Sequence, residues 1–326
     1  MPVLECTRNP LAAVVIRLTS VPRSDKLKYM SRLMFAALTS LVLVGSERAA
    51  AQRVAGRDLL DFPLGLLAEA PALSSQLHAG FWSPATSMLG PSSQAAFGFA
   101  GLTTPQELGV HLEMLSAAYK VRPNVTGSLS IVDAAVSDVL RTDTDPTSLG
   151  GEIPYGTTVA SLGAATTMRK VTLGLAARYR WGSADSDHSG TFALDVGAVA
   201  DSVFRTPIRL AASTFLFNPS SAKDATYFAA ADLPLVRRDS TVVRGGYSIA
   251  YSESRGTESL AFATATYRWV DLSSAFVMAR EFGNSTERWR LGLGVRRAGY
   301  IVAIAREAGG AGIGASYQFL LTRTVK

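Results

Sequence analysis

The sequence predicts an all-β fold, a closed antiparallel transmembrane β-barrel of about fourteen strands with a small N-terminal plug. The clearest pattern lies in residues 171–181 (VTLGLAARYRW), where apolar side chains alternate with small or charged ones. Successive side chains of a strand point to opposite faces, so this segment has one apolar and one polar face. The apolar face ends in Tyr179 and Trp181, ring types that lie where hydrocarbon meets lipid headgroups.

Strand length and composition support the same fold. A tilted strand needs roughly 9–11 residues to cross a bilayer, and alternating segments of about this length recur as far as residue 321. Only 18% of the residues are charged, 28 are glycine, and the mean hydropathy is +0.18. Beyond residue 51 no apolar run reaches the roughly 20 residues of a membrane-spanning helix. This combination predicts a barrel with a polar interior.

Charge and cysteine content exclude several classes of site. Residues 1–51 hold seven Lys or Arg and three Asp or Glu, which leaves 25 against 23, or +2, for the rest of the chain. Because positive and negative charges nearly balance in the rest of the chain, it offers no basic face for binding nucleic acid. The single cysteine, Cys6, excludes an internal disulfide framework and a cysteine-based metal site. No apolar region precedes Cys6, so we expect no lipidation there.

A secretory signal is predicted in residues 30–52. Arg32 supplies the positive start, residues 33–45 the apolar middle and Ala49–Ala51 the small-residue cleavage site. The alternative is a short buried helix. Translation could start at Met1 or Met30, and the mature chain is expected to begin near Gln52. The expected organisation is therefore an upstream extension and signal in residues 1–51, a plug in 52–92 and a barrel in 93–326.

Residues 53–92 lack alternation and are expected to form the plug. They are apolar but interrupted by proline and glycine, and they include Phe81, Trp82 and Pro84. They are too apolar for a free tail and too broken for spanning strands. We expect this segment at or inside the periplasmic mouth of the barrel, with an irregular N-terminal strap as the alternative.

The remaining chain divides into fourteen predicted strands. Two show the alternation almost as clearly as residues 171–181: in 287–297 leucines oppose arginines, and in 241–253 tyrosines oppose serines. The segment 207–217 is weaker because Phe215 is out of phase with Leu210, and Pro234 should mark a strand end or bulge. The expected strands are 93–102, 108–121, 125–136, 156–168, 171–181, 191–201, 207–217, 225–236, 241–253, 258–269, 271–282, 287–297, 300–307 and 311–321.

The links between these strands predict the orientation of the barrel. Alternate links sum to 51 residues on one side and 17 on the other. Outer-membrane barrels have long extracellular loops and short periplasmic turns. The even strand count then places both termini on the periplasmic side.

The layout resembles the FadL-type family of fourteen-stranded outer-membrane channels for hydrophobic compounds, and it is most similar to the compact PorV-type relatives associated with type IX secretion. The resemblance rests on Trp82-Ser83-Pro84-Ala85 before the first strand, on Gly150–Tyr155 leading into a strand, and on the consecutive strands 170–181 and 192–199. Ser83 stands where these proteins often have Asn. The resemblance implies a barrel with a small plug in contact with lipids or exported proteins.

Charged residues on the inward face are the candidate site. They could form a wall that binds anions, because Arg offers a bidentate fork to a carboxylate. Alternatively they are a ladder of mutually paired charges that fills the lumen, which we favour. The residues are Arg178, Arg180, Asp195, Asp201, Arg244, Arg288, Arg290 and Arg296.

Catalytic and metal sites have weak support in the sequence. The chain has three histidines, and His188 lies in a polar loop where adjacency to serine and aspartate does not build a triad. The acidic loops 143–145 and 185–187 lack the glycine and distal glutamate of a calcium loop. We therefore expect no enzyme, no cofactor and no metal.

These features predict an outer-membrane barrel for passive passage or binding of hydrophobic or amphipathic small molecules. The alternative is a non-transporting barrel that docks exported proteins or partner subunits. A soluble secreted all-β sandwich is the rival fold, in which the apolar strand faces would meet each other.

Overall fold

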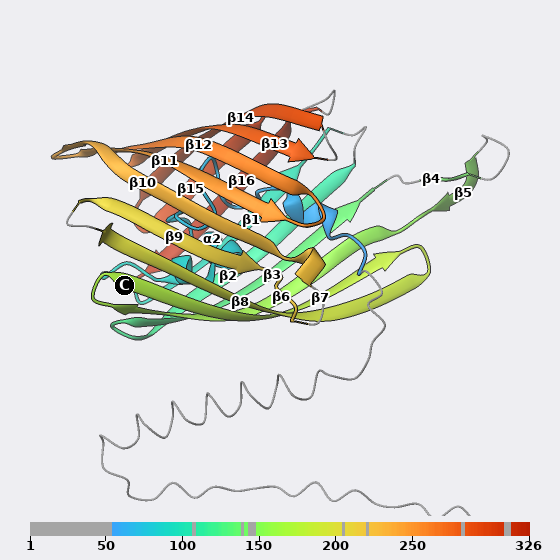
Figure 1. The fold of residues 1–326 in the computed structure, drawn as a ribbon, viewed down its shortest axis with the longest axis horizontal. Coiled ribbons are helices and arrows are strands. Elements are labelled where there is room, and N and C mark those ends of the chain that lie inside the picture. The colour runs from blue at the N-terminus through green and yellow to red at the C-terminus, as the bar shows by residue number, and fades with distance from the viewer. Residues whose placement is uncertain are drawn as a thin grey trace, which may run out of the picture. The chain divides into compact units, whose positions relative to one another are not determined.

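The computed structural model describes residues 54–105, 109–137, 140–142, 148–203, 206–219, 222–281, 284–309 and 314–326. Fourteen antiparallel strands form a closed barrel, in which each strand pairs with its neighbours in the chain and β1 pairs with β16 (Figure 1). The strands are β1 (Ala95–Thr103), β2 (Val110–Arg122), β3 (Val125–Val136), β6 (Tyr155–Met168), β7 (Val171–Ala184), β8 (Asp187–Val203), β9 (Ile208–Phe215), β10 (Thr226–Arg238), β11 (Thr241–Ser252), β12 (Gly256–Tyr267), β13 (Val270–Glu281), β14 (Asn284–Arg297), β15 (Tyr300–Glu307) and β16 (Ser316–Val325).

The predicted closed antiparallel barrel and its fourteen strands are confirmed, with local differences. The last strand runs over Ser316–Val325 and not 311–321, because β1 pairs with it as far as the Ala95–Val325 contact. The long link 137–155 contains a separate two-stranded sheet of β4 (Leu140–Thr142) and β5 (Ser148–Glu152). The register of β10 and β11 shifts between Pro234 and Val236, so of the two outcomes predicted for Pro234, a strand end or a bulge, the structure has the bulge. Residues 1–53, which include the predicted signal, lie outside the described residues, as does the acidic loop 143–145.

Two ends of the barrel can be distinguished by their links. The link between β6 and β7 is short and defines the turn end, whereas the long link after β3 defines the loop end. In β7, Val171 is therefore at the turn end and Ala184 at the loop end.

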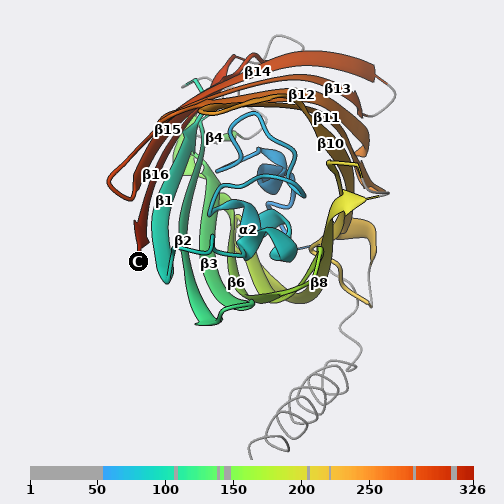
Figure 2. The same ribbon diagram turned by 90° about the vertical axis from the view of Figure 1, so that its left-hand side faces the viewer.

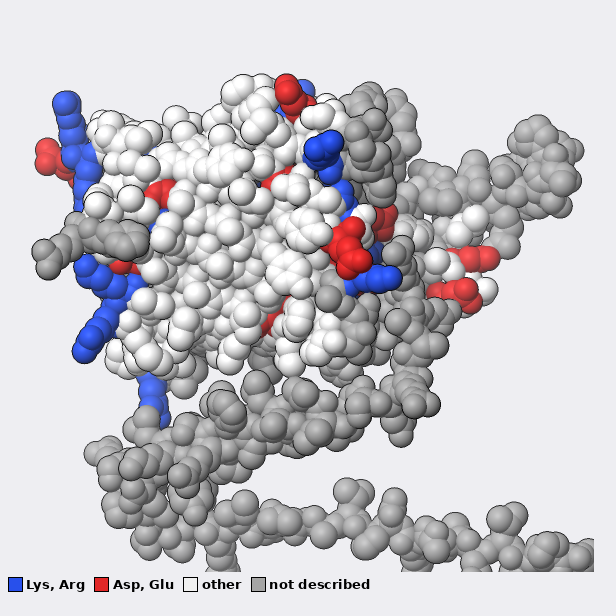
Figure 3. All heavy atoms as spheres, in the orientation of Figure 1, with Lys and Arg blue, Asp and Glu red and all other residues white. Residues whose placement is uncertain are grey.

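The outer wall is apolar between two rows of aromatic side chains. At the loop end Trp181 and Trp289 are exposed, and at the turn end Trp269 and Tyr300 are exposed. Ten residue steps along a strand at about 3.3 Å, tilted by about 40°, span about 25 Å, the height of the apolar band of membrane barrels. Figure 3 shows a wall with few charged spheres between its two ends. Exposed aliphatic residues between the rows include Leu115, Leu129, Ile131, Leu162, Leu173, Leu175, Leu272, Leu291, Leu293 and Ile304.

In the described part of the chain, no helix is long and apolar enough to span a membrane.

Residues 54–94, here called the lumen segment, lie inside the barrel up to about residue 89 and emerge at residues 90–94, most of which are exposed (Figure 2). The segment contains the short helices η1 (Asp58–Asp61), α2 (Ala79–Trp82) and η2 (Pro84–Ser87). Asp58 accepts a hydrogen bond from the Tyr155 hydroxyl at the loop end, 2.6 Å away. The carbonyl of Gly90 accepts one from Lys120 at the turn end. The segment thus runs the length of the lumen, whereas the sequence placed it at or inside one mouth.

The interior is only partly polar: buried serine, threonine and charged side chains line it together with an apolar core. The lumen segment buries a run of leucines, including Leu60, Leu64 and Leu66. The strand faces that contact this core are apolar too, for example Leu112 and Met114 of β2. Burying apolar surface stabilises by about 25 cal/mol per Å², so an apolar segment inside the lumen favours apolar inward residues around it.

Candidate functional site

Inward-facing glycines in β7 and β8 let the lumen segment approach the wall. A Cβ on Gly174 would overlap the backbone of Pro84 and Ala85, and one on Gly182 would overlap the carbonyl of Ala55. A Cβ on Gly197 would lie 3.1 Å from the backbone nitrogen of Ala85. The small residues that alternate with apolar ones in β7 therefore make space for the segment.

Polar contacts tie the middle of the lumen segment to the opposite wall. His78 is fully buried, and its Nδ1 lies 3.2 Å from the Ser116 hydroxyl, which in turn lies 3.1 Å from the Ser130 hydroxyl. The backbone N–H of Gly65 donates to Gln318 of β16 at 3.1 Å. Burial lowers the pKa of His78 to about 4, so the ring is neutral at pH 7.

The predicted lumen residues Arg178 and Asp195 form an ion pair that is fully buried. The Arg178 guanidinium carbon lies 4.8 Å from the ring centroids of both Phe81 and Phe215. Asp195 also accepts a hydrogen bond from the backbone N–H of Phe217 at 2.9 Å. The cost of removing these two charges from water is offset by their mutual attraction, by the backbone donor of Phe217 and by the two aromatic faces.

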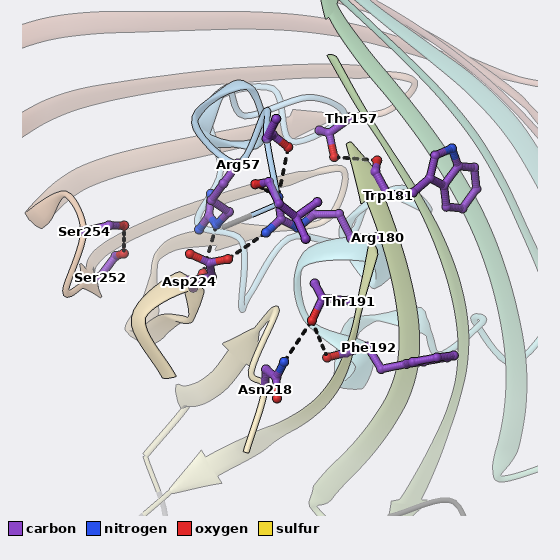
Figure 4. A network of polar contacts seen from close by, with 12 residues as sticks. Arg57, Thr157, Arg180, Trp181, Thr191, Phe192, Asn218, Asp224, Ser252 and Ser254 are labelled. Carbon is purple, nitrogen blue, oxygen red and sulfur yellow. Dashed lines mark hydrogen bonds and ion pairs between the residues drawn. The ribbon is translucent and has the colours of Figure 1, made fainter. Parts of the chain in front are cut away.

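At the loop end, Arg180 and Arg57 converge on Asp224 (Figure 4). Arg180 donates to the Asp224 carboxylate at 2.7 Å and to the Val54 carbonyl at 2.9 Å. Arg57 donates to the Asp224 carbonyl at 2.9 Å and pairs with Asp61 at 2.7 Å. A second arginine, Arg255, also pairs with Asp61 at 3.0 Å. The start of the lumen segment is thus fastened to the wall and to two links.

The other predicted arginines are also paired with carboxylates. Arg288 bridges Glu258 at 2.9 Å and Glu307 at 3.3 Å, and Arg290 pairs with Glu307 at 2.7 Å. Two further ion pairs lie nearer the turn end, between Arg244 and Asp232 at 2.6 Å, and between Arg296 and Asp271.

These pairs match the ladder of mutually paired charges more closely than an open wall for anions. Asp201 lies apart from them, exposed at the turn end of β8. Of the predicted plug residues, Phe81, Trp82 and Pro84 are all buried inside the barrel.

Several partners in this site were not predicted from the sequence. Asp232 shares the inward face of β10 with Phe228 and Ala230, and Glu307 shares that of β15 with Ala303 and Ala305. The alternation of side chains along each strand would have predicted that Asp232 and Glu307 face inward. Arg57, Asp61 and Asp224 lie outside the strands, where no periodic signal exists.

A cavity of about 70 Å³ lies between the lumen segment and strands β9 to β12 and β14. Its apolar lining includes Leu60, Leu66, Trp82, Phe215, Phe228 and Leu260. Its charged lining is Arg57, Asp61, Arg255, Glu258 and Arg290. The position of Arg255 between β11 and β12 places the charged part at the loop end.

Comparisons with known proteins give similarity in fold alone. No family model matches the chain, and no curated protein matches it. Among solved structures, a TodX deltaS2S3 mutant, described as a monoaromatic hydrocarbon channel, has a TM-score of 0.55 at 10% identity, covering 80% of this chain and 99% of that one. The Acinetobacter baumannii outer membrane protein Omp33 has a TM-score of 0.46 at 8% identity, covering 73% of this chain and 100% of that one. The chain therefore has a β-barrel fold that a hydrocarbon channel also has.

Proposed function

We propose that the chain is an outer-membrane barrel that binds and passes small hydrophobic or amphipathic molecules, with the lumen segment as its plug. The observation that carries this proposal is the cavity beside Trp82, which has an apolar base and a charged rim at the loop end. Residues 1–51 would be removed as a signal, and the apolar outer wall would contact membrane lipid.

The lining favours neutral, weakly polar molecules. Arg57 and Arg255 both pair with Asp61, and Arg290 pairs with Glu307. With their guanidinium groups engaged by carboxylates, these arginines are poorly placed to hold an anionic ligand. The apolar lining then supplies most of the affinity, as in most small-molecule sites. The description of TodX as a monoaromatic hydrocarbon channel supports this ligand class.

Passage would be passive and would require displacement of the lumen segment. A cavity of about 70 Å³ is about half the roughly 150 Å³ of an engineered apolar cavity that binds benzene. An aromatic hydrocarbon needs more space than this, so entry must widen the cavity. The segment moves as a plug if its contacts with β7 and β8 open.

Tryptophan fluorescence tests binding directly. The chain has four tryptophans, of which Trp181, Trp269 and Trp289 are exposed on the outer wall. Replacing these three with Phe leaves Trp82 as the single reporter inside the lumen. We expect toluene or naphthalene to change its emission saturably. Leu260→Phe, which fills the cavity, should weaken the change at least threefold, whereas Leu320→Phe, in the same core but outside the cavity lining, should not.

Uptake by proteoliposomes tests passage. We expect naphthalene to enter protein-containing vesicles faster than protein-free ones. Absence of both a saturable Trp82 signal and faster uptake would overturn the proposal. The alternative role, docking of exported proteins by a non-transporting barrel, is not favoured by these observations.

A further inference from the structure

The turn end of the barrel is basic. Exposed or half-buried cations occupy its strand ends and turns, whereas the acidic residues described there are Asp201, Asp239 and Asp271, the last paired with Arg296. Figure 3 shows Lys and Arg gathered at the end that carries the C label in Figure 1. The cations are Lys120, Arg122, Arg169, Lys170, Arg237, Arg238, Arg268, Arg297, Arg323 and Lys326.

Two of these cations lie against the aromatic row of the outer wall. The guanidinium carbon of Arg323 is 4.0 Å from the Tyr300 ring centroid, and that of Arg268 is 5.4 Å from the Tyr267 centroid. Tyrosine and tryptophan rings mark the headgroup level of a bilayer. In a membrane, this basic end would therefore face the headgroups of the turn-side leaflet.

One groove at this end has the features of a headgroup site. It measures about 440 Å³ and is lined by residues 91–94, 120–123 and Lys326, with no acidic side chain among them. The Lys120 ammonium donates to the Gly90 carbonyl at 2.7 Å and to the Pro91 carbonyl at 3.2 Å. An ammonium has three donors, so one remains for a ligand.

The groove also reaches the apolar outer wall. Val121, one of its lining residues, is 62% exposed, on the same face of β2 as Tyr119 and Leu115. A ligand that fits must therefore carry a negative charge next to an apolar chain.

We propose that this groove binds the headgroup of an anionic phospholipid from the turn-side leaflet. The lipid phosphate would accept hydrogen bonds from Lys120 and Arg122, while its acyl chain would lie along Val121 and Tyr119. This inference rests on the proposed function, because it requires the barrel to span a membrane.

Lipid titration followed by native mass spectrometry tests the site in the detergent-solubilised full-length protein. We expect phosphatidylglycerol to bind at least tenfold more tightly than phosphatidylcholine. Lys120→Gln with Arg122→Gln should remove this preference. The matched control Arg237→Gln with Arg238→Gln, which loses the same charge at another turn of the same end, should retain it. Arg122→Gln alone, which leaves the Lys120 contacts with the lumen segment intact, should weaken it at least threefold.

An unchanged preference for phosphatidylglycerol in both groove variants would overturn the proposed site. Equal losses in the groove and control variants would also overturn it, because they would indicate a general attraction of the basic end for anionic lipid. Flotation with phosphatidylcholine vesicles separates this failure from failure of the proposed function. A protein that inserts into these vesicles but shows no preference contradicts only the groove. A protein that does not insert contradicts membrane spanning itself.

Discussion

Phe81 of the lumen segment and Arg178 of β7 stack inside the barrel, with the guanidinium carbon 4.8 Å from the ring centroid. Phe215 covers the guanidinium at the same distance. The contact joins the lumen segment to the wall at a residue whose charge is already paired with Asp195. A desolvated cation–aromatic contact contributes about 2 kcal/mol, so this one is a principal attachment of the segment.

Removing the charge of Arg178 alone should destabilise the barrel strongly. Arg178→Met leaves the Asp195 carboxylate buried without its counter-ion, a change that costs about 3–5 kcal/mol. Urea unfolding in lipid vesicles measures it. The double variant Arg178→Met with Asp195→Asn removes both charges and should recover most of the loss. A double variant as unstable as the single one would show that the pair does not act as a unit.

Acid should destabilise the protein through His78. Its pKa is lowered to about 4 by burial, against about 6.5 in an unfolded chain. Between these values the unfolded state binds more protons, so stability is full above about pH 6.5 and falls as the pH approaches 4. The loss is at most about 3 kcal/mol.

Urea unfolding across this pH range, compared between wild type and His78→Gln, isolates the His78 contribution. Burial raises the pKa of Glu69, which acts in the opposite direction because its protonated form is favoured in the folded state. Equal slopes in the two proteins would contradict the assignment to His78.

A larger side chain at Gly174 should displace the lumen segment. The added Cβ overlaps the backbone of Pro84 and Ala85, and backbone cannot move aside as a flexible side chain can. Gly174→Ala should therefore raise naphthalene uptake and expose residues 54–94 to proteolysis. Gly127→Ala is the matched control, because its Cβ would meet a methyl group of Val121 at 3.8 Å. The same protease pattern in both variants would argue against a tight contact at Gly174.

A reversible tether should close the channel. The Cβ of Ala85 lies 3.3 Å from the position of a Cβ on Gly197, near the roughly 3.5–4.5 Å that a disulfide requires. The variant Ala85→Cys with Gly197→Cys should lose at least fivefold of its uptake when oxidised and regain it on reduction. Each single cysteine variant controls for the substitutions. Full uptake by the oxidised double variant would show that the lumen segment does not need to leave β8.

The sequence by itself determined the strand number and the face that each clear strand turns outward. Leu173 and Leu291 are exposed while Arg178 and Arg290 are buried, because alternation is a local property of every extended strand. It also marked Pro234 as a strand end or bulge, because proline lacks a backbone donor, and the structure has a bulge there. The out-of-phase Phe215 was a further local signal, since it turns inward to pack on Phe81 and Trp82.

Only the tertiary structure decided how the lumen is filled. Arg57 contacts Asp224, which lies 167 positions away, and Gly65 contacts Gln318 across 253 positions. Such pairs form where an irregular segment crosses a closed wall, and neither partner belongs to a repeating pattern. The path of residues 54–94 depends on the shape and charge of the whole interior, which exists only once fourteen strands have closed.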